Sequence, residues 1–266
     1  MEYKVVVCDL DGTLLDSNHA LTERTKNEIK RVSGLGLKVI LATGRHYIDV
    51  KGVAGELDLD TCVIGSNGTR VYSGDGEKLI MHNLDEKVVE SVLGYDLPKD
   101  VHLNIYQGKE WLVFEDNEEL LRFHTHSGFS YRKLVNREGV NSKGVNKFYF
   151  YSHNKEALNE VERDLKAVLD GIADVFFSLH TVVEVMPKGI SKGLALQEMM
   201  KDNGIKPDEV IAFGDGLNDY EMLSWVGKGL LMKNADQKLI ELLPDLDIIN
   251  SNSEDGVAEF LEQYIS

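Results

Sequence analysis

Four short runs of almost entirely apolar residues constrain the fold of this chain more than any other feature of its sequence. They occupy residues 5–8, 38–42, 62–65 and 210–213, and polar residues follow each of them closely. Apolar runs without alternation are typical of parallel strands that helices cover on both faces. Segments with a helical pattern follow some of these runs along the chain, as parallel strand–helix–strand units require. The sequence therefore predicts an α/β fold with a Rossmann-like parallel sheet.

Two of the expected helices have recognisable starts. The first is expected to begin at a capping box formed by Thr25 and Glu28 and to end near Gly34. The second is expected to begin at Ser191, whose hydroxyl can cap the first turn. Both helices would cover the predicted sheet.

The middle of the chain has a different pattern. Residues 101–106, 111–114 and 147–151 mix polar and aromatic side chains, as antiparallel strands do, and residues 155–170 place leucines and valines on one helical face. We therefore predict two domains. Residues 1–83 and 188–266 would form a discontinuous α/β core, and residues 84–187 would form an inserted α+β cap domain.

Composition limits the partners that the chain can bind. Its 29 Lys and Arg against 45 Asp and Glu give a formal charge of -16, which would repel nucleic acid and an anionic membrane. A phosphorylated metabolite would need a local cation to bind. Cys8 and Cys62 lie in apolar runs and are expected to be reduced thiols. With no secretory signal and no bilayer-length apolar stretch, a soluble cytoplasmic protein is expected, with no signal for an oligomeric state.

Polar residues at the ends of the predicted strands are candidates for a functional site, because ligands of open α/β sheets bind at the carboxyl ends of the strands. The candidates are Asp9, Asp11, Gly12 and Thr13 after the first run, Thr43, Gly44 and Arg45 after the second, Asn67 and Gly68 after the third, and Asp215, Asn218 and Asp219 after the last. Crowded carboxylates require a cation, and an oxygen-only ligand set suits Mg²⁺. Asp9 and Asp215 are the expected direct ligands, and Asp219 is expected to hold a metal-bound water.

Each candidate also has a simpler interpretation. Residues 9–12 could form a polar turn, and residues 214–219 are a partial match to a dinucleotide-binding loop. Thr43 could only cap a helix, and Lys192 could be a solvated lysine in a first helical turn. A lysine at that position opposes the helix dipole, which favours an anionic partner.

Taken together, DLDGTLL (9–15), ATGR (42–45), PKGISKG (187–193) and GDGLND (214–219) resemble, in sequence and in order, the four motifs of the haloacid dehalogenase superfamily. The insertion resembles the subclass IIB cap of the Cof-type phosphatases. The resemblance implies a two-step phosphoryl transfer. Asp9 would be the nucleophile, and Asp11 would be the general acid and base.

The resemblance also implies a ligand set around the transferred phosphate. Phosphate would be bound by Thr43, Gly44, Lys192 and Asn218, and Mg²⁺ by Asp9, Asp11 through its backbone carbonyl, Asp215 and Asp219. Lys188 offers a second Lys-Gly pair, but Lys192 lies at the expected helix start, and it is the lysine that we select.

The resulting hypothesis is a magnesium-dependent phosphatase that hydrolyses a small phosphomonoester, such as a sugar phosphate, through an aspartyl-phosphate on Asp9. A phosphomutase or another phosphotransferase and a non-catalytic phosphoryl-binding regulator are the alternatives. The cap would close over the site and set specificity. Its candidate contacts are Tyr106, His124, His180 and Glu184.

Overall fold

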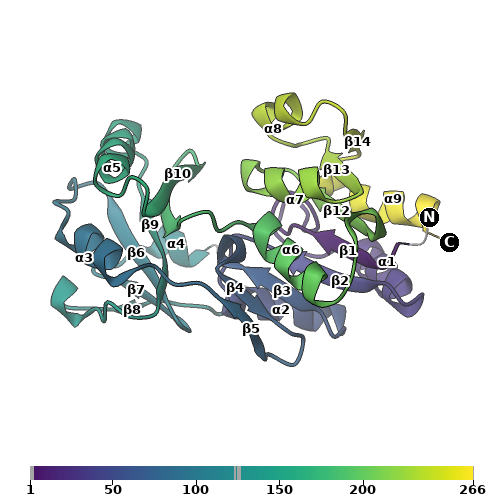
Figure 1. Cartoon of the computed structure of the whole chain (residues 1–266), viewed down its shortest axis with the longest axis horizontal. Coiled ribbons are helices and arrows are strands. Elements are labelled where there is room, and N and C mark those ends of the chain that lie inside the picture. Colours follow the sequence, from purple (N-terminus) through teal and green to yellow (C-terminus); the bar gives the residue numbers. More distant parts are fainter. Residues whose placement is uncertain (1–2, 123, 125–126, 266) are drawn as a thin grey trace. The chain divides into compact units, whose positions relative to one another are not determined.

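The chain forms two compact units. The structure is a computed structural model and describes residues 3–122, 124 and 127–265. The first unit comprises 1–80 and 191–266, and the second comprises 81–190. Figure 1 shows that the chain contributes to the first unit twice, through its purple-to-blue beginning and its green-to-yellow end. Among the described residues, no helix has both the length and the apolar character that a membrane span requires.

The first unit is built on a mixed sheet in which the predicted runs are neighbours. Its strands, in spatial order, are β14 (Asp247–Ile249), β13 (Lys228–Met232), β12 (Val210–Gly214), β1 (Val5–Cys8), β2 (Lys38–Ala42), β3 (Cys62–Gly65), β4 (Arg70–Tyr72) and β5 (Lys78–Met81). The strands from β14 to β3 are parallel. The α/β class predicted from the apolar runs is therefore confirmed.

The antiparallel strand β4 was not predicted. It pairs with β3 immediately after a tight reversal, so that Gly65 lies opposite Arg70. The reversal is the short 3₁₀ helix η1 (Ser66–Gly68), whose three residues have φ angles of 48°, 54° and 97°. Asn67 and Gly68 are residue types that tolerate left-handed conformations, whereas Ser66 is not, so the sequence marked the end of the third run but not the reversal into a paired strand.

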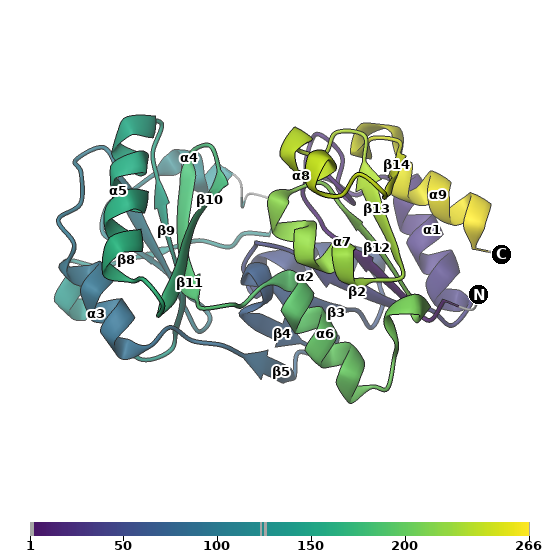
Figure 2. The ribbon, with the colours of Figure 1, turned by 45° about the horizontal axis from the view of Figure 1, so that its top comes forward.

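Helices cover both faces of this sheet. Alternate residues of β1 belong to opposite cores: Val6 packs with α1 (Glu23–Gly34) and α9 (Gly256–Tyr264), whereas Val7 packs with α6 (Lys192–Asp202) and α7 (Tyr220–Trp225). Figure 2 shows α1 and α9 side by side. The remaining helices of this unit are α2 (Tyr47–Leu57) and α8 (Gln237–Leu242). Burial on both faces explains why β1 has no polar residue.

The second unit is an α+β structure. Its sheet has the order β10 (Ala173–Leu179), β11 (Val182–Pro187), β9 (Val145–Tyr151), β6 (His102–Gln107), β7 (Glu110–Val113) and β8 (Arg132–Lys133). Its pairs are antiparallel except for β7 with β8. The helices α3 (Glu86–Gly94) and α5 (Lys155–Val168) pack on one face, around Phe148 and Phe150 (Figure 2), while α4 (Glu118–Arg122) is a short helix after β7.

The start of α1 corrects one prediction. The N-cap is Thr22, whose hydroxyl oxygen accepts a hydrogen bond from the Thr25 amide at 3.1 Å and whose hydroxyl donates to Asp255 at 2.5 Å. The predicted capping box of Thr25 and Glu28 is wrong. Glu28 instead forms an ion pair with Arg31 at 2.6 Å. Ser191, by contrast, is the N-cap of α6 as predicted.

Thr22→Ala should therefore destabilise the protein by about 1 kcal/mol, because the first turn of α1 loses its cap. Thr22→Ser keeps the hydroxyl and should retain most of the stability. Urea unfolding followed by circular dichroism measures both changes. Equal losses in the two variants would contradict the assignment of Thr22 as the cap.

Candidate active site

Three neighbouring strands of the first unit end in predicted site residues. Strand β1 lies between β2 and β12, and Asp9, Thr43 and Asp215 directly follow these three strands. The Asp9 amide donates to the carbonyl of Phe213 at 3.1 Å, and the Thr43 amide donates to the carbonyl of Ile64 at 2.8 Å. The sheet register itself thus brings these residues to one edge.

A cluster of three carboxylates lies at this edge. Oxygen atoms of Asp9, Asp215 and Asp219 come within 4.8 Å of one another. Burial raises the pKa of Asp9 well above its usual value, although the nearby Lys192 opposes this shift. Burial, together with the charge of Asp219, raises the pKa of Asp215 to about 6. The cluster therefore holds its negative charge only at an electrostatic cost.

Lys192 supplies a positive charge inside this cluster. As the first residue of α6, it is positioned by the cap of Ser191, whose hydroxyl oxygen accepts from the Leu194 amide at 3.1 Å. Its side chain is fully buried, and Nζ donates to Asp9 Oδ1 at 2.6 Å and to Asp219 Oδ1 at 2.7 Å. Burial alone would lower the pKa of Lys192, but the two carboxylates outweigh it and raise that pKa.

Asp219 also organises the loop after β12. Its Oδ2 accepts the amides of Asp215 and Gly216 at 3.1 and 3.0 Å, while its Oδ1 accepts from Lys192. A β-carbon at Gly214 would lie 2.7 Å from the Asp219 side chain, so this loop requires glycine there. Asp219 therefore fixes both the lysine and the loop that carries Asp215.

The residues present fit a bound divalent cation. Three carboxylates against one ammonium leave two negative charges uncompensated when all groups are ionised. All the candidate ligands are oxygen atoms, the donors that Mg²⁺ prefers. Because burial raises the pKa of both Asp9 and Asp215, a cation at this position would offset the cost of keeping them ionised.

The turn after β1 packs closely against Asp215. A β-carbon at Gly12, whose φ is +82°, would lie 2.3 Å from Asp215 Oδ2. The Thr13 hydroxyl donates to Asp215 Oδ1 at 2.8 Å. Only glycine permits this approach, and Thr13, which the sequence placed at the strand end without a role, orients the carboxylate of Asp215.

The predicted phosphate-binding residues Thr43, Gly44 and Asn218 gather around Asn67 of η1. The Asn67 amide donates to the carbonyl of Thr43 at 3.0 Å, and Asn218 Nδ2 donates to Asn67 Oδ1 at 3.0 Å. A β-carbon at Gly44 would lie 3.1 Å from Asn67 Oδ1. Asn67 was predicted only as a residue at a strand end, and that position was the available signal for its role.

Asp11 has different partners from the carboxylate cluster. Its carboxylate forms a bidentate pair with Arg45, at 2.7 Å to Nε and 2.5 Å to Nη2, and lies 2.9 Å from His19 Nδ1. Burial would raise the pKa of Asp11, but the hydrogen bonds from His19 and Arg45 outweigh it and hold that pKa below its usual value. Arg45 lies in a recognised motif, whereas nothing in the sequence singled out His19.

The contacts of Lys188 and Lys192 differ, and they bear on the selection of Lys192 as the phosphate-binding lysine. Lys188 belongs to the second unit, where its Nζ lies 2.7 Å from Asp174 Oδ1 in a half-exposed ion pair. Lys192 is the lysine in the carboxylate cluster.

Among the candidate cap contacts, Glu184 is buried and pairs with Lys147 at 2.8 Å. The Lys147 ammonium also lies 5.4 Å from the centre of the Tyr106 ring.

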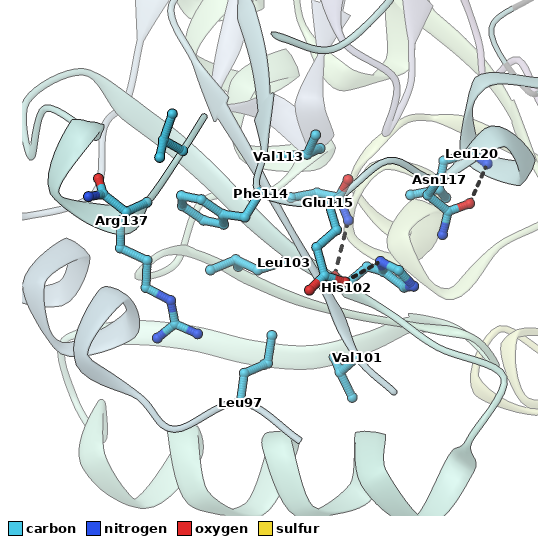
Figure 3. A pocket seen from close by; sticks show the side chains of 13 residues that line it. Leu97, Val101, His102, Leu103, Val113, Phe114, Glu115, Asn117, Leu120 and Arg137 are labelled. Atoms are coloured by element: carbon cyan, nitrogen blue, oxygen red, sulfur yellow. Dashed lines mark hydrogen bonds and ion pairs between the residues drawn. The ribbon is translucent and has the colours of Figure 1, made fainter. Parts of the chain in front are cut away.

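The second unit contains a separate pocket of about 310 Å³. Figure 3 shows its apolar wall, which includes Leu97, Leu103 and Phe114, and the nearby ion pair of His102 with Glu115. Arg137 also lines it, with Nη1 donating to the carbonyls of Leu93 and Tyr95. None of the predicted catalytic, phosphate-binding or metal-binding residues lines this pocket.

Comparison with known proteins identifies the family. The family profile described as haloacid dehalogenase-like hydrolase matches residues 6–261. A protein of Haemophilus influenzae whose name places it among phosphatases is 37% identical, over 98% of this chain and 96% of its own. A protein of Yersinia pseudotuberculosis named HMP-PP phosphatase is 35% identical, over 99% of this chain and 96% of its own.

A solved structure supports the same assignment. A haloacid dehalogenase-like hydrolase from Bacteroides thetaiotaomicron, 27% identical, superposes with a TM-score of 0.85 over 98% of this chain and 99% of that one. The motif order, the fold and these relatives agree. The chain belongs to the haloacid dehalogenase-like hydrolases, and it is a phosphatase.

Proposed function

We propose that this phosphatase depends on magnesium and hydrolyses a small phosphomonoester through an aspartyl-phosphate on Asp9. The observation that carries the proposal is the buried ammonium of Lys192, which touches both Asp9 and Asp219 at the carboxyl edge of the sheet. The Lys192 ammonium favours the ionised form of Asp9, which is the form that attacks phosphorus, and it compensates part of the charge where the reaction occurs.

In the first step, the Asp9 carboxylate attacks phosphorus and forms an acyl phosphate. Asp11 is ionised in the site without substrate, and the negative charge of a bound phosphoryl group would favour its protonated form. The bond between phosphorus and the leaving oxygen then breaks, and Asp11 donates a proton to that oxygen. In the second step, Asp11 accepts a proton from water as the water attacks phosphorus. The acyl phosphate bond breaks, inorganic phosphate leaves, and the Asp9 carboxylate is restored.

The phosphoryl oxygens need positive partners throughout both steps. Lys192 contributes its ammonium, and Thr43, Gly44 and Asn218 would contribute hydroxyl, backbone and amide donors. The contacts of Thr43 and Asn218 with Asn67 support this assignment, since they hold both residues at the edge where Asp9 lies. The net charge of -16 makes such local donors necessary.

Asp9, the backbone carbonyl of Asp11 and Asp215 would hold Mg²⁺. When bound, the ion neutralises charge on the phosphoryl oxygens during transfer. Thr13 orients Asp215 toward this position, and Asp219 restrains the loop that carries it. Asp219 would support the metal site through this loop or through a water.

Two classes of substrate have support. The resemblance to Cof-type enzymes favours a hexose or pentose phosphate, and the relatives named HMP-PP phosphatase favour HMP-PP. Both are small phosphorylated metabolites.

Asp9→Asn should reduce phosphate release on the order of a thousandfold or more, because an amide is a poor nucleophile. Asp202→Asn, a change to an exposed aspartate of α6, is the matched control and should leave turnover unchanged. Phosphate release and circular dichroism measure activity and folding. Retained turnover in a folded Asp9→Asn variant would exclude the aspartyl-phosphate mechanism.

Lys192→Met should lower kcat by roughly a hundredfold or more, because the phosphoryl oxygens and Asp9 lose their buried cation. Lys188→Met is the matched control, since Lys188 is exposed and pairs with Asp174. Steady-state kinetics and thermal unfolding should be recorded for both. Near-normal turnover of Lys192→Met, or an equal loss in Lys188→Met, would contradict the assignment.

EDTA should abolish phosphate release and added Mg²⁺ should restore it, tested on a panel that contains sugar phosphates and HMP-PP. Asp215→Asn should weaken Mg²⁺ binding, measured by calorimetry, on the order of tenfold to a hundredfold. Asp202→Asn again serves as the control. Undiminished release in EDTA, together with unchanged Mg²⁺ affinity in Asp215→Asn, would exclude magnesium dependence.

A further inference from the structure

His19 lies at the tip of a tight turn that follows β1. The Asp16 carboxylate accepts the amides of Asn18 and Ala20 at 2.8 and 3.0 Å, and the Asp16 amide donates to the carbonyl of Ala20 at 2.9 Å. His19 itself adopts a φ of 58°, and its amide donates to the carbonyl of Asp16. The turn is therefore held from within by Asp16, and the imidazole of His19 is not needed to close it.

The imidazole instead contacts Asp11. Nδ1 of His19 lies 2.9 Å from Asp11 Oδ1, the oxygen that also accepts from Arg45 Nη2. Because an ionised carboxylate only accepts hydrogen bonds, Nδ1 is assigned as the donor. Two different segments thus hold one carboxylate: Arg45 lies in the loop between β2 and α2, and His19 lies in the turn at residues 16–20.

Arg45 is itself restrained. Its Nη1 lies 3.4 Å from Asp49 Oδ2, and its side chain is mostly buried. The bidentate contact fixes Asp11 relative to the guanidinium, and the contact from His19 adds a restraint from a second direction. The His19 and Asp11 side chains are 48% and 39% exposed, so their contact contributes little to folding stability.

We propose that His19 is a positioning residue that sets the orientation of Asp11 for proton exchange with the leaving oxygen. This inference rests on the proposed function, in which Asp11 is the general acid and base. His19 touches neither substrate nor metal in this proposal, and it acts only through Asp11. A proton donor must be held within hydrogen-bond reach of the leaving oxygen, so a loosely oriented Asp11 would transfer its proton less efficiently.

The leaving group of the substrate distinguishes positioning from a general structural effect. An alkyl alkoxide is a poor leaving group and needs a proton as its bond to phosphorus breaks. The p-nitrophenolate ion is stable without one. A defect in the orientation of Asp11 should therefore appear in kcat/KM for an alkyl phosphomonoester and be nearly absent for p-nitrophenyl phosphate.

The experiment compares four chains on these two substrates: the unmodified protein, His19→Ala, His19→Asn and Asn18→Ala. We expect His19→Ala to lower kcat/KM for the alkyl substrate roughly tenfold, as loss of a supporting hydrogen bond commonly does. His19→Asn should recover most of this loss, because its amide can donate from nearly the same place and asparagine tolerates a positive φ. Asn18→Ala changes the same turn without touching Asp11 and should behave as the unmodified protein.

Asp11→Asn and the double variant His19→Ala with Asp11→Asn complete the test. Asp11→Asn should show a larger loss with the same selectivity for the alkyl substrate, and adding His19→Ala should cause little further loss. If Asp11→Asn is selective but His19→Ala is unchanged or impairs both substrates equally, the positioning role of His19 is wrong. If Asp11→Asn itself shows no selectivity, the proposed role of Asp11 fails, and this inference fails with it.

Discussion

The buried contact of Lys192 with Asp9 and Asp219 is the interaction on which the rest of the site depends. It joins the beginning of α6 to the end of β1 and to the loop after β12. Removing one member of such a buried group leaves uncompensated charge, which is strongly destabilising. In the proposed function the same ammonium would also contact the phosphoryl group, so the chemical and structural demands on Lys192 would coincide.

The sequence predicted the parts of the fold that depend on continuous burial. The runs at β1, β2, β3 and β12 were recognisable because strands covered on both faces cannot tolerate polar residues. Their order in the sheet, with β1 between β2 and β12, follows the usual arrangement of α/β proteins and brings Asp9 close to Asp215. The site residues at these strand ends could be proposed for this reason alone.

The remaining features depend on conformations that no periodic pattern records. The reversal at Ser66–Gly68 places three successive residues in the left-handed region, and it brings Asn67 to Asn218 and turns the chain into β4. The contact between His19 and Asp11 likewise depends on a left-handed residue in a short turn. The cap of α1 was misassigned because Thr22 and Thr25 are both acceptable caps by type, and only the extended backbone at Thr22 decides between them.

The discontinuity of the first unit has a consequence for how the protein is made. Asp9 and Lys192 lie 183 residues apart in sequence, with the whole second unit between them. During synthesis, which proceeds from the N-terminus, Asp9 leaves the ribosome long before its partners exist. Until then its carboxylate stays hydrated and acidic like any aspartate in water. The nascent chain therefore cannot assemble this site until synthesis has passed the second unit and reached β12 and the loop beyond it.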